Sequence, residues 1–274
     1  MNLVLHHGIF GFAQVADVVY FNGVKDRLTA TVPGLRVLVT QVAPAGGIAL
    51  RGGQLGEQIL QALQPGGILD PNEKVHIIAH SMGGLDARFL LSPDNSNNLS
   101  ERVTSLTTIS TPHKGSPIAD VLVEIKNSIS IEERLLDHAL RAALEHADIP
   151  AGGLDDLTTA GVAKFNDQFR DNAGTKKFSV AGIGRGITVF GIIPLDTCAV
   201  LRLPYRIIKD RTEGEDNDGL VSLSSATWGV GPELWPADHV DEVGHNLDLG
   251  AHAAPAHFDH LAKYQALVEK LRQL

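Results

Sequence analysis

Cysteine is almost absent from this sequence. Cys198 is the only one in 274 residues, so no disulfide can form within the chain and the fold does not depend on an oxidising compartment. Basic residues are outnumbered, with 23 Lys and Arg against 32 Asp and Glu and a net charge of -9. A general nucleic-acid-binding protein would need a basic surface, so the charge argues against nucleic-acid partners.

Long apolar runs are also missing, so we expect no transmembrane segment. The opening MNLVLHHGIF has neither a basic start nor an extended apolar stretch, and no signal peptide is visible. We therefore expect a cytoplasmic protein, or a secreted one if the chain is a mature form. Oligomeric state is not readable from the sequence.

The overall composition is ordinary for a soluble globular protein, with 43% hydrophobic and 20% charged residues. The length suits one large α/β domain or two small ones. No long linker rich in Ser, Pro or charge divides the chain. We therefore predict a single domain over residues 1–274.

The most informative stretch runs from Lys74 to Leu91. An apolar strand over Val75 to Ala79 is followed by a very tight turn and then by a helix from Met82. This arrangement matches the G-x-S-x-G elbow that exposes a nucleophilic serine above a parallel sheet, with Ala79 in place of the first glycine. Ser81 is the candidate nucleophile, although a relaxed five-residue pattern also arises by chance.

Strands and helices alternate along the rest of the chain, which predicts an α/β fold with a parallel sheet. The segment from Pro117 to about Phe169 has no predicted strand, and Ile131 to His146 within it is amphipathic. That helix either packs on the core or forms a lid over the site. Further predicted strands are Leu3–His6, Leu35–Gln41, Val103–Ile109 and Phe178–Ala181, with helices at Gly53–Leu63 and Phe258–Leu274 and an irregular region over Gly182–Arg211.

A serine hydroxyl needs a neutral histidine to take its proton, and that histidine needs a carboxylate on its other nitrogen. In α/β-hydrolases these residues follow the chain order Ser, acid, His. Ser81, Asp218 and His239 obey this order, and His245 also fits as the base. The acidic turn that contains Asp218 is predicted to place a carboxylate in a loop after a strand, although it could equally be a solvated surface loop or a calcium loop. The glycine-containing loop after Leu3–His6 could supply backbone N–H groups to an oxyanion.

Five separated stretches are similar to the bacterial true lipases of the Pseudomonas, Burkholderia and Proteus type. They are HGIFGF at residues 7–12, AHSMGG at 79–84, TPHKGSPIAD at 111–120, NDGLVS at 217–222 and HVDEV at 239–243. The resemblance implies an α/β-hydrolase fold with a mostly parallel sheet of about six strands, flanking helices and an inserted helical lid at about residues 117–169.

The resemblance also implies roles for particular residues. Ser81 would be the nucleophile, Asp218 the acid and His239 the base, with the oxyanion hole formed by the backbone N–H groups of Ile9 and Met82. No cofactor is expected for catalysis. A structural Ca²⁺ would bind the side chains of Asp196 and Asp241 and the backbone carbonyls of His245 and Leu249. Many relatives also carry a disulfide and a signal peptide, whereas this sequence has a single cysteine and no visible signal peptide, so we do not expect secretion from the resemblance alone.

The sequence thus predicts a lipase or carboxylesterase that hydrolyses (tri)acylglycerol or related esters through an acyl-enzyme. The expected partners are a lipid or small ester substrate, with transient contact between the lid and a lipid interface. Alternatives are a soluble short-chain esterase or an acyltransferase that uses the same intermediate. A non-catalytic hydrolase homologue is a further alternative, against which the complete Ser, Asp and His set argues.

Overall fold

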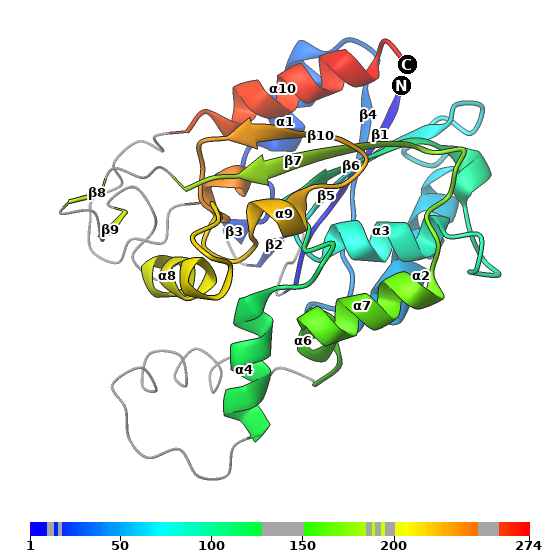
Figure 1. The fold of residues 1–274 in the computed structure, drawn as a ribbon. Helices are drawn as coiled ribbons and strands as arrows, with labels where there is room; N and C mark the ends of the chain where they lie inside the picture. The colour runs from blue at the N-terminus through cyan, green and yellow to red at the C-terminus, as the bar shows by residue number, and fades with distance from the viewer. Residues whose placement is uncertain are drawn as a thin grey trace.

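The computed structural model describes residues 1–9, 14–15, 18–127, 151–184, 188–189, 193–194, 201–245 and 258–274. Its main feature is a six-stranded sheet in the order β10-β7-β6-β5-β1-β4, and every pair of neighbours in it is parallel (Figure 1). The strands are β4 (Arg36–Val39), β1 (Asn2–His6), β5 (Val75–His80), β6 (Val103–Ile109), β7 (Lys176–Gly182) and β10 (Val230–Trp235). The predicted parallel α/β architecture is confirmed.

Helices cover both faces of this sheet. They are α1 (Val24–Thr31), α2 (Ile48–Ala62), α3 (Gly83–Leu91), α4 (Pro117–Asn127), α6 (Ala151–Asp156), α7 (Thr159–Gln168), α8 (Arg202–Arg211), α9 (Leu223–Ala226) and α10 (His260–Leu271), with 3-10 turns η1 (Ser100–Arg102) and η3 (Asp241–Val243). Two small antiparallel pairs lie outside the sheet: β2 (Gln14–Val15) with β3 (Val18–Val19), and β8 (Thr188–Val189) with β9 (Ile193–Pro194).

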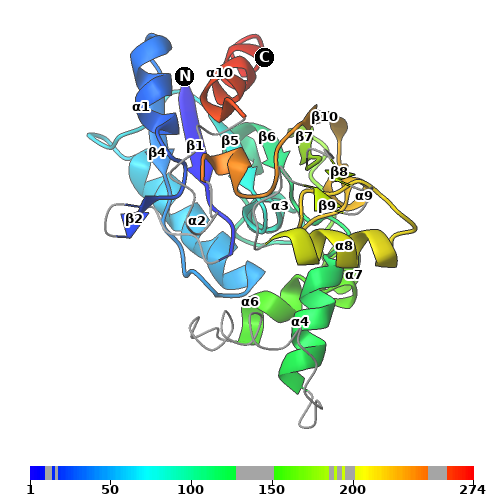
Figure 2. The same cartoon turned by 90° about the vertical axis from the view of Figure 1, so that its left-hand side faces the viewer.

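The sheet is buried between two helical layers because successive strand residues point to opposite faces. On β1, Leu3 and Leu5 belong to the core beneath α1 and α10, whereas Val4 belongs to the core beneath α2 and α3. The two views place α1 and α10 on one side and α2 and α3 on the other (Figures 1 and 2). Strands that are apolar on both faces are therefore what this sandwich requires.

The segment between β6 and β7 forms α4, α6 and α7, and the structure describes no strand in it outside residues 128–150. Leu154, Leu157 and Phe165 of this segment pack with Met82 and Leu85 at the start of α3. The inserted helices therefore contact the elbow directly. The amphipathic stretch predicted at residues 131–146 lies outside the described residues.

Two sequence predictions for the later part of the chain are wrong. The region over residues 182–211, predicted to be irregular, ends in helix α8, and the acidic segment before Asp218 follows this helix rather than a strand. Pro204 lies in the first turn of α8, where a missing N–H costs nothing. Strand β10 was not predicted because it contains Gly231 and Pro232, but as the last strand of the sheet it tolerates a proline. Among the described residues, no helix is both long and apolar enough to cross a membrane.

Candidate active site

Ser81 lies at the turn between β5 and α3, in a conformation that side chains rarely adopt. Its φ is 55°, and its backbone N–H donates to Ile109 O on β6 at 2.8 Å. The turn is close-packed, because a Cβ on Gly83 would come within 2.7 Å of His7 O. Position 83, two residues after the serine, therefore requires glycine, as the elbow pattern predicts. Met82 occupies the N-cap position of α3, at the end of the helix where the helix dipole favours negative charge.

Asp218 and His239 are in direct contact. His239 Nδ1 donates to Asp218 Oδ2 at 2.6 Å, and both side chains are buried. The other carboxylate oxygen, Oδ1, accepts from the backbone N–H groups of Leu220 and Val221 at 2.8 and 2.7 Å. These bonds fix the carboxylate, which in turn fixes the histidine with its proton on Nδ1 and its Nε2 free to accept one.

His245, the alternative base, is placed differently. Its Nε2 lies 2.9 Å from Val19 O and 3.0 Å from Tyr20 O. Because carbonyl oxygens only accept, this nitrogen carries a proton and donates it to the backbone. The structure therefore pairs Asp218 with His239 and not with His245.

The loop after β1 lies against the nucleophile. A Cβ on Gly8 would come within 2.6 Å of Ser81 Cβ, so only glycine allows this approach. His7 Nδ1 donates to Gly8 O at 2.8 Å, and its Nε2 accepts from Val42 N at 3.1 Å. Burial lowers the pKa of His7 to about 3, which keeps the ring neutral. Ile9, the next residue, lines the cavity that contains Ser81.

A buried ionic cluster supports the same loop from below. Asp86 Oδ2 on α3 accepts from Arg51 Nε on α2 at 2.8 Å and lies 3.0 Å from His6 Nε2. Arg51 also donates to His7 O at 2.7 Å. Asp86, Arg51 and His6 are completely buried. Helices α2 and α3 are thereby tied to the end of β1, where the loop begins.

A second buried chain of polar groups, which the sequence did not predict, runs beside the triad. His80 Nε2 lies 2.9 Å from Glu242 Oε2, and Ser110 Oγ donates to Glu242 Oε1 at 2.6 Å. Burial lowers the pKa of His80 well below its ordinary value and raises the pKa of Glu242 well above. The centroids of the His80 and His239 rings lie 4.5 Å apart. The only sequence signals were their positions, His80 next to Ser81 and Glu242 within HVDEV.

Ser81 and His239 both line one cavity of about 430 Å³. Its lining includes apolar residues from the segment between β6 and β7 and from the two positions after Gly219: Ile118, Ala119, Leu122, Leu154, Leu157, Leu220 and Val221. Such a cavity suits an aliphatic or aromatic group held next to a reactive hydroxyl. The arrangement can therefore perform acyl transfer on a ligand with an apolar acyl chain.

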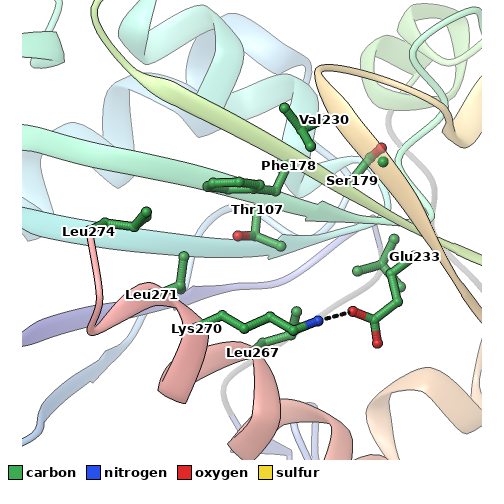
Figure 3. A pocket seen from close by; sticks show the side chains of 11 residues that line it. Thr107, Phe178, Ser179, Val230, Glu233, Leu267, Lys270, Leu271 and Leu274 are labelled. Atoms are coloured by element: carbon green, nitrogen blue, oxygen red, sulfur yellow. Dashed lines mark hydrogen bonds and ion pairs between the residues drawn. The ribbon is translucent and has the colours of Figure 1, made fainter.

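Another cavity, of about 320 Å³, lies between the C-terminal end of α10 and strands β7 and β10 (Figure 3). Phe178, Leu267 and Leu271 form its apolar walls, and Lys270 Nζ pairs with Glu233 Oε2 at 2.6 Å beside it. None of the predicted site residues that the structure describes lines it. The catalytic groups thus belong to the first cavity.

The predicted calcium ligands are only partly visible. Asp196 and Leu249 lie outside the described residues, whereas Asp241 is the first residue of the turn η3 and His245 lies two residues after its end. In the described part of the chain, one group of three side chains lies close enough to bind a metal, namely His80, His239 and Glu242. These side chains hydrogen-bond to protein groups instead, and none belongs to the predicted calcium set.

Comparisons with known proteins point in one direction. The family described as PGAP1-like alpha/beta domain matches residues 57–173. A triacylglycerol lipase of Vibrio cholerae is 31% identical over 291 positions, covering 99% of this chain and 87% of that protein. Triacylglycerol lipase 2 of Saccharomyces cerevisiae is 30% identical over 85% of this chain, but the match covers only 64% of its own length.

Solved structures show the same fold. The Staphylococcus hyicus lipase superposes with a TM-score of 0.70 at 21% identity, over 99% of this chain and 95% of that one. A metagenomic carboxyl esterase superposes with a TM-score of 0.71 at 19% identity, over 100% of this chain and 76% of that one. Both likenesses are to chains of the α/β-hydrolase fold predicted from the elbow.

Proposed function

Because the chain belongs to the bacterial triacylglycerol lipases of the α/β-hydrolase type, we propose that it hydrolyses carboxylic esters, acylglycerols among them, with Ser81, His239 and Asp218 as its catalytic triad. The observation that carries the proposal is the Asp218–His239 contact, in which His239 lines the same apolar cavity as Ser81. Asp218, fixed by its two backbone donors, holds His239 in the tautomer that a general base requires.

The reaction proceeds in two halves. His239 Nε2 takes the proton of Ser81 Oγ as this oxygen attacks the ester carbonyl carbon, and the carbonyl oxygen becomes an oxyanion. The N–H groups of Ile9 and Met82 stabilise this charge. The bond to the alcohol then breaks, and His239 returns the proton to the departing oxygen. A water molecule, deprotonated by His239, next attacks the acyl carbonyl carbon; the bond from this carbon to Ser81 Oγ then breaks, His239 returns the proton to Ser81 Oγ, and the acid leaves.

We also propose that the single domain carries a lid inserted at about residues 117–169. The support is that Ile118 and Leu122 of α4 and Leu154 of α6 line the cavity beside Ser81. Apolar side chains over a reactive serine suit an enzyme whose lid opens against lipid and places acyl chains in the cavity. This feature favours a lipase over an esterase restricted to short, soluble esters.

A structural calcium ion belongs to the proposal as well. Asp241 lies two residues after His239, so a cation bound there would stabilise the loop that carries the base. The ion would have no part in the chemistry, and the enzyme needs no catalytic cofactor.

The decisive experiment uses the Ser81→Ala variant. It should lose at least about 10⁴-fold in kcat on a p-nitrophenyl ester and on emulsified triacylglycerol while keeping its melting temperature, because only the nucleophile is removed. Ser100→Ala on the surface serves as the control and should match the wild type. The wild-type rate on a partly soluble triacylglycerol should rise once droplets form. Retained turnover in Ser81→Ala would disprove the triad, and a flat response to droplets would favour an esterase.

A further inference from the structure

Gly8, the residue before the oxyanion donor Ile9, is held by a tyrosine. Its backbone N–H donates to the Tyr20 hydroxyl at 3.1 Å, and a Cβ on Gly8 would lie only 2.9 Å from that oxygen. The carbonyl of the same residue accepts from His7 Nδ1. In the trans peptide between Gly8 and Ile9, the Gly8 C=O and the Ile9 N–H point in opposite directions, so the His7 contact sets the direction of the Ile9 N–H. The Tyr20 contact holds the preceding peptide, and together the two contacts fix the backbone on both sides of the Gly8 Cα.

Tyr20 is itself held by the buried series of polar side chains beside the triad. Its hydroxyl lies 2.7 Å from His80 Nδ1, and His80 Nε2 lies 2.9 Å from Glu242 Oε2. Because a backbone N–H can only donate, the Tyr20 oxygen accepts from Gly8, and its single hydrogen is available to His80. Glu242 is fixed at its other oxygen by Ser110, whose Oγ accepts from Gly182 N at 3.0 Å.

This series of hydrogen-bonded side chains joins three loops that are distant in the sequence. Tyr20 reaches the loop after β1, His80 immediately precedes the nucleophile, and Glu242 lies three residues after His239. We propose that Tyr20, through His80 and Glu242, is a positioning residue that aligns the oxyanion loop with Ser81 and His239. The inference rests on the proposed function and adds a role to that site.

Removal of the Tyr20 hydroxyl would leave two buried partners, Gly8 N–H and His80 Nδ1, without this hydrogen bond. The peptide between His7 and Gly8 would then lose its hydrogen bond, and only the Gly8–Ile9 peptide would still be held, by His7. A displacement of about 1 Å at a reacting group can cost about 10²-fold in rate. The stabilising hydrogen bonds matter most when the oxyanion forms, so the loss should appear in kcat rather than in KM.

The test compares Tyr20→Phe with Tyr264→Phe. We expect Tyr20→Phe to lower kcat on a p-nitrophenyl ester about 10- to 100-fold with KM within about threefold. Its affinity for an alkyl boronate, which forms a tetrahedral anion on the serine, should fall by a similar factor. Tyr264 is a matched control because its buried hydroxyl has no hydrogen-bond partner in the described structure. Tyr264→Phe should leave both quantities unchanged.

A second variant protects the test against a folding defect. His80→Gln keeps a polar group toward Glu242 but removes the nitrogen that Tyr20 contacts. His80→Gln alone should lower kcat. Adding Tyr20→Phe to His80→Gln should lower kcat by much less than Tyr20→Phe does in the wild type, because both substitutions interrupt the same series of hydrogen bonds. Unchanged kcat and boronate affinity in folded Tyr20→Phe, or independent effects of the two substitutions, would overturn the inference. A failure of the triad itself would show instead as an active Ser81→Ala.

Discussion

Buried histidines hold the catalytic edge of this protein together in their neutral form. His6, His7, His80 and His113 are almost completely buried, and burial lowers the pKa of each. Each ring contacts defined partners, as when His113 stacks on Trp228 at 4.9 Å and lies 3.1 Å from Thr108 Oγ1. A neutral ring accepts at one nitrogen and donates at the other, and these bonds depend on that asymmetry.

This chemistry predicts a dependence of stability on pH. In the unfolded chain a histidine gains a proton near pH 6.5, whereas the folded His113 does so only at much lower pH because of burial and the charge of Arg88. The unfolded state binds more protons below this pH, so the free energy of unfolding falls as the pH falls. The raised pKa of Glu242 acts in the opposite sense and partly offsets the fall.

His113→Gln isolates one such contribution. Between pH 7 and pH 5 the variant should lose up to about 2 kcal/mol less stability than the wild type, because the buried neutral His113 costs the wild type up to about 1.4 kcal/mol of unfolding free energy per pH unit below 6.5. Urea unfolding at the two pH values measures this, and the Glu242 contribution cancels because both proteins contain it. Equal losses in the two proteins would contradict the prediction.

At the scale of elements, helix α2 shows how closely the layers approach. A Cβ on Gly52 would lie 2.6 Å from Phe89 and 2.8 Å from Asp86 O, both on α3. On Gly53, the next residue of the same helix, a Cβ would meet no atom within 4 Å. The first glycine allows two helices to pack, and the second only lowers helix propensity.

Two neighbouring substitutions should therefore differ in sign. Gly52→Ala should lower the free energy of unfolding by about 1–3 kcal/mol through overpacking. Gly53→Ala should raise the free energy of unfolding by about 0.5–1 kcal/mol, because alanine has a higher helix propensity than glycine at this exposed helical position. Chemical denaturation of the two variants against the wild type measures both. A similar effect of the two changes would show that α2 does not pack on α3 as described.

The sequence revealed those elements whose pattern is local. Strand β6 was predicted at its observed bounds, and the elbow was predicted from a handful of small residues around Ser81. The contacts of Tyr20 and Glu242 with His80 could not be predicted. Tyr20 lies 60 residues before His80 and Glu242 lies 162 residues after it, and neither separation is a characteristic spacing. A buried polar chain of this kind depends on which loops the sheet brings together.

For the whole molecule, the proposed calcium ion has a measurable consequence. If a cation joins Asp241 to the loops beside it, a chelator should lower the melting temperature, because a ligand that binds only the folded state stabilises it. A loss of about 2–4 kcal/mol corresponds to roughly 4–16 °C for a protein of this size. In the Asp241→Asn variant the melting temperature should already be lower and insensitive to the chelator. A wild-type protein that melts identically with and without chelator would contradict the site.

The left-handed backbone at Ser81 has a consequence for the history of such proteins. This conformation costs a residue with a side chain of order 1–3 kcal/mol, an appreciable part of the 5–15 kcal/mol that keeps a typical domain folded. In a descendant lineage that had lost the activity, drift toward glycine at this position would increase stability, so the residue found there distinguishes active from inactive lineages.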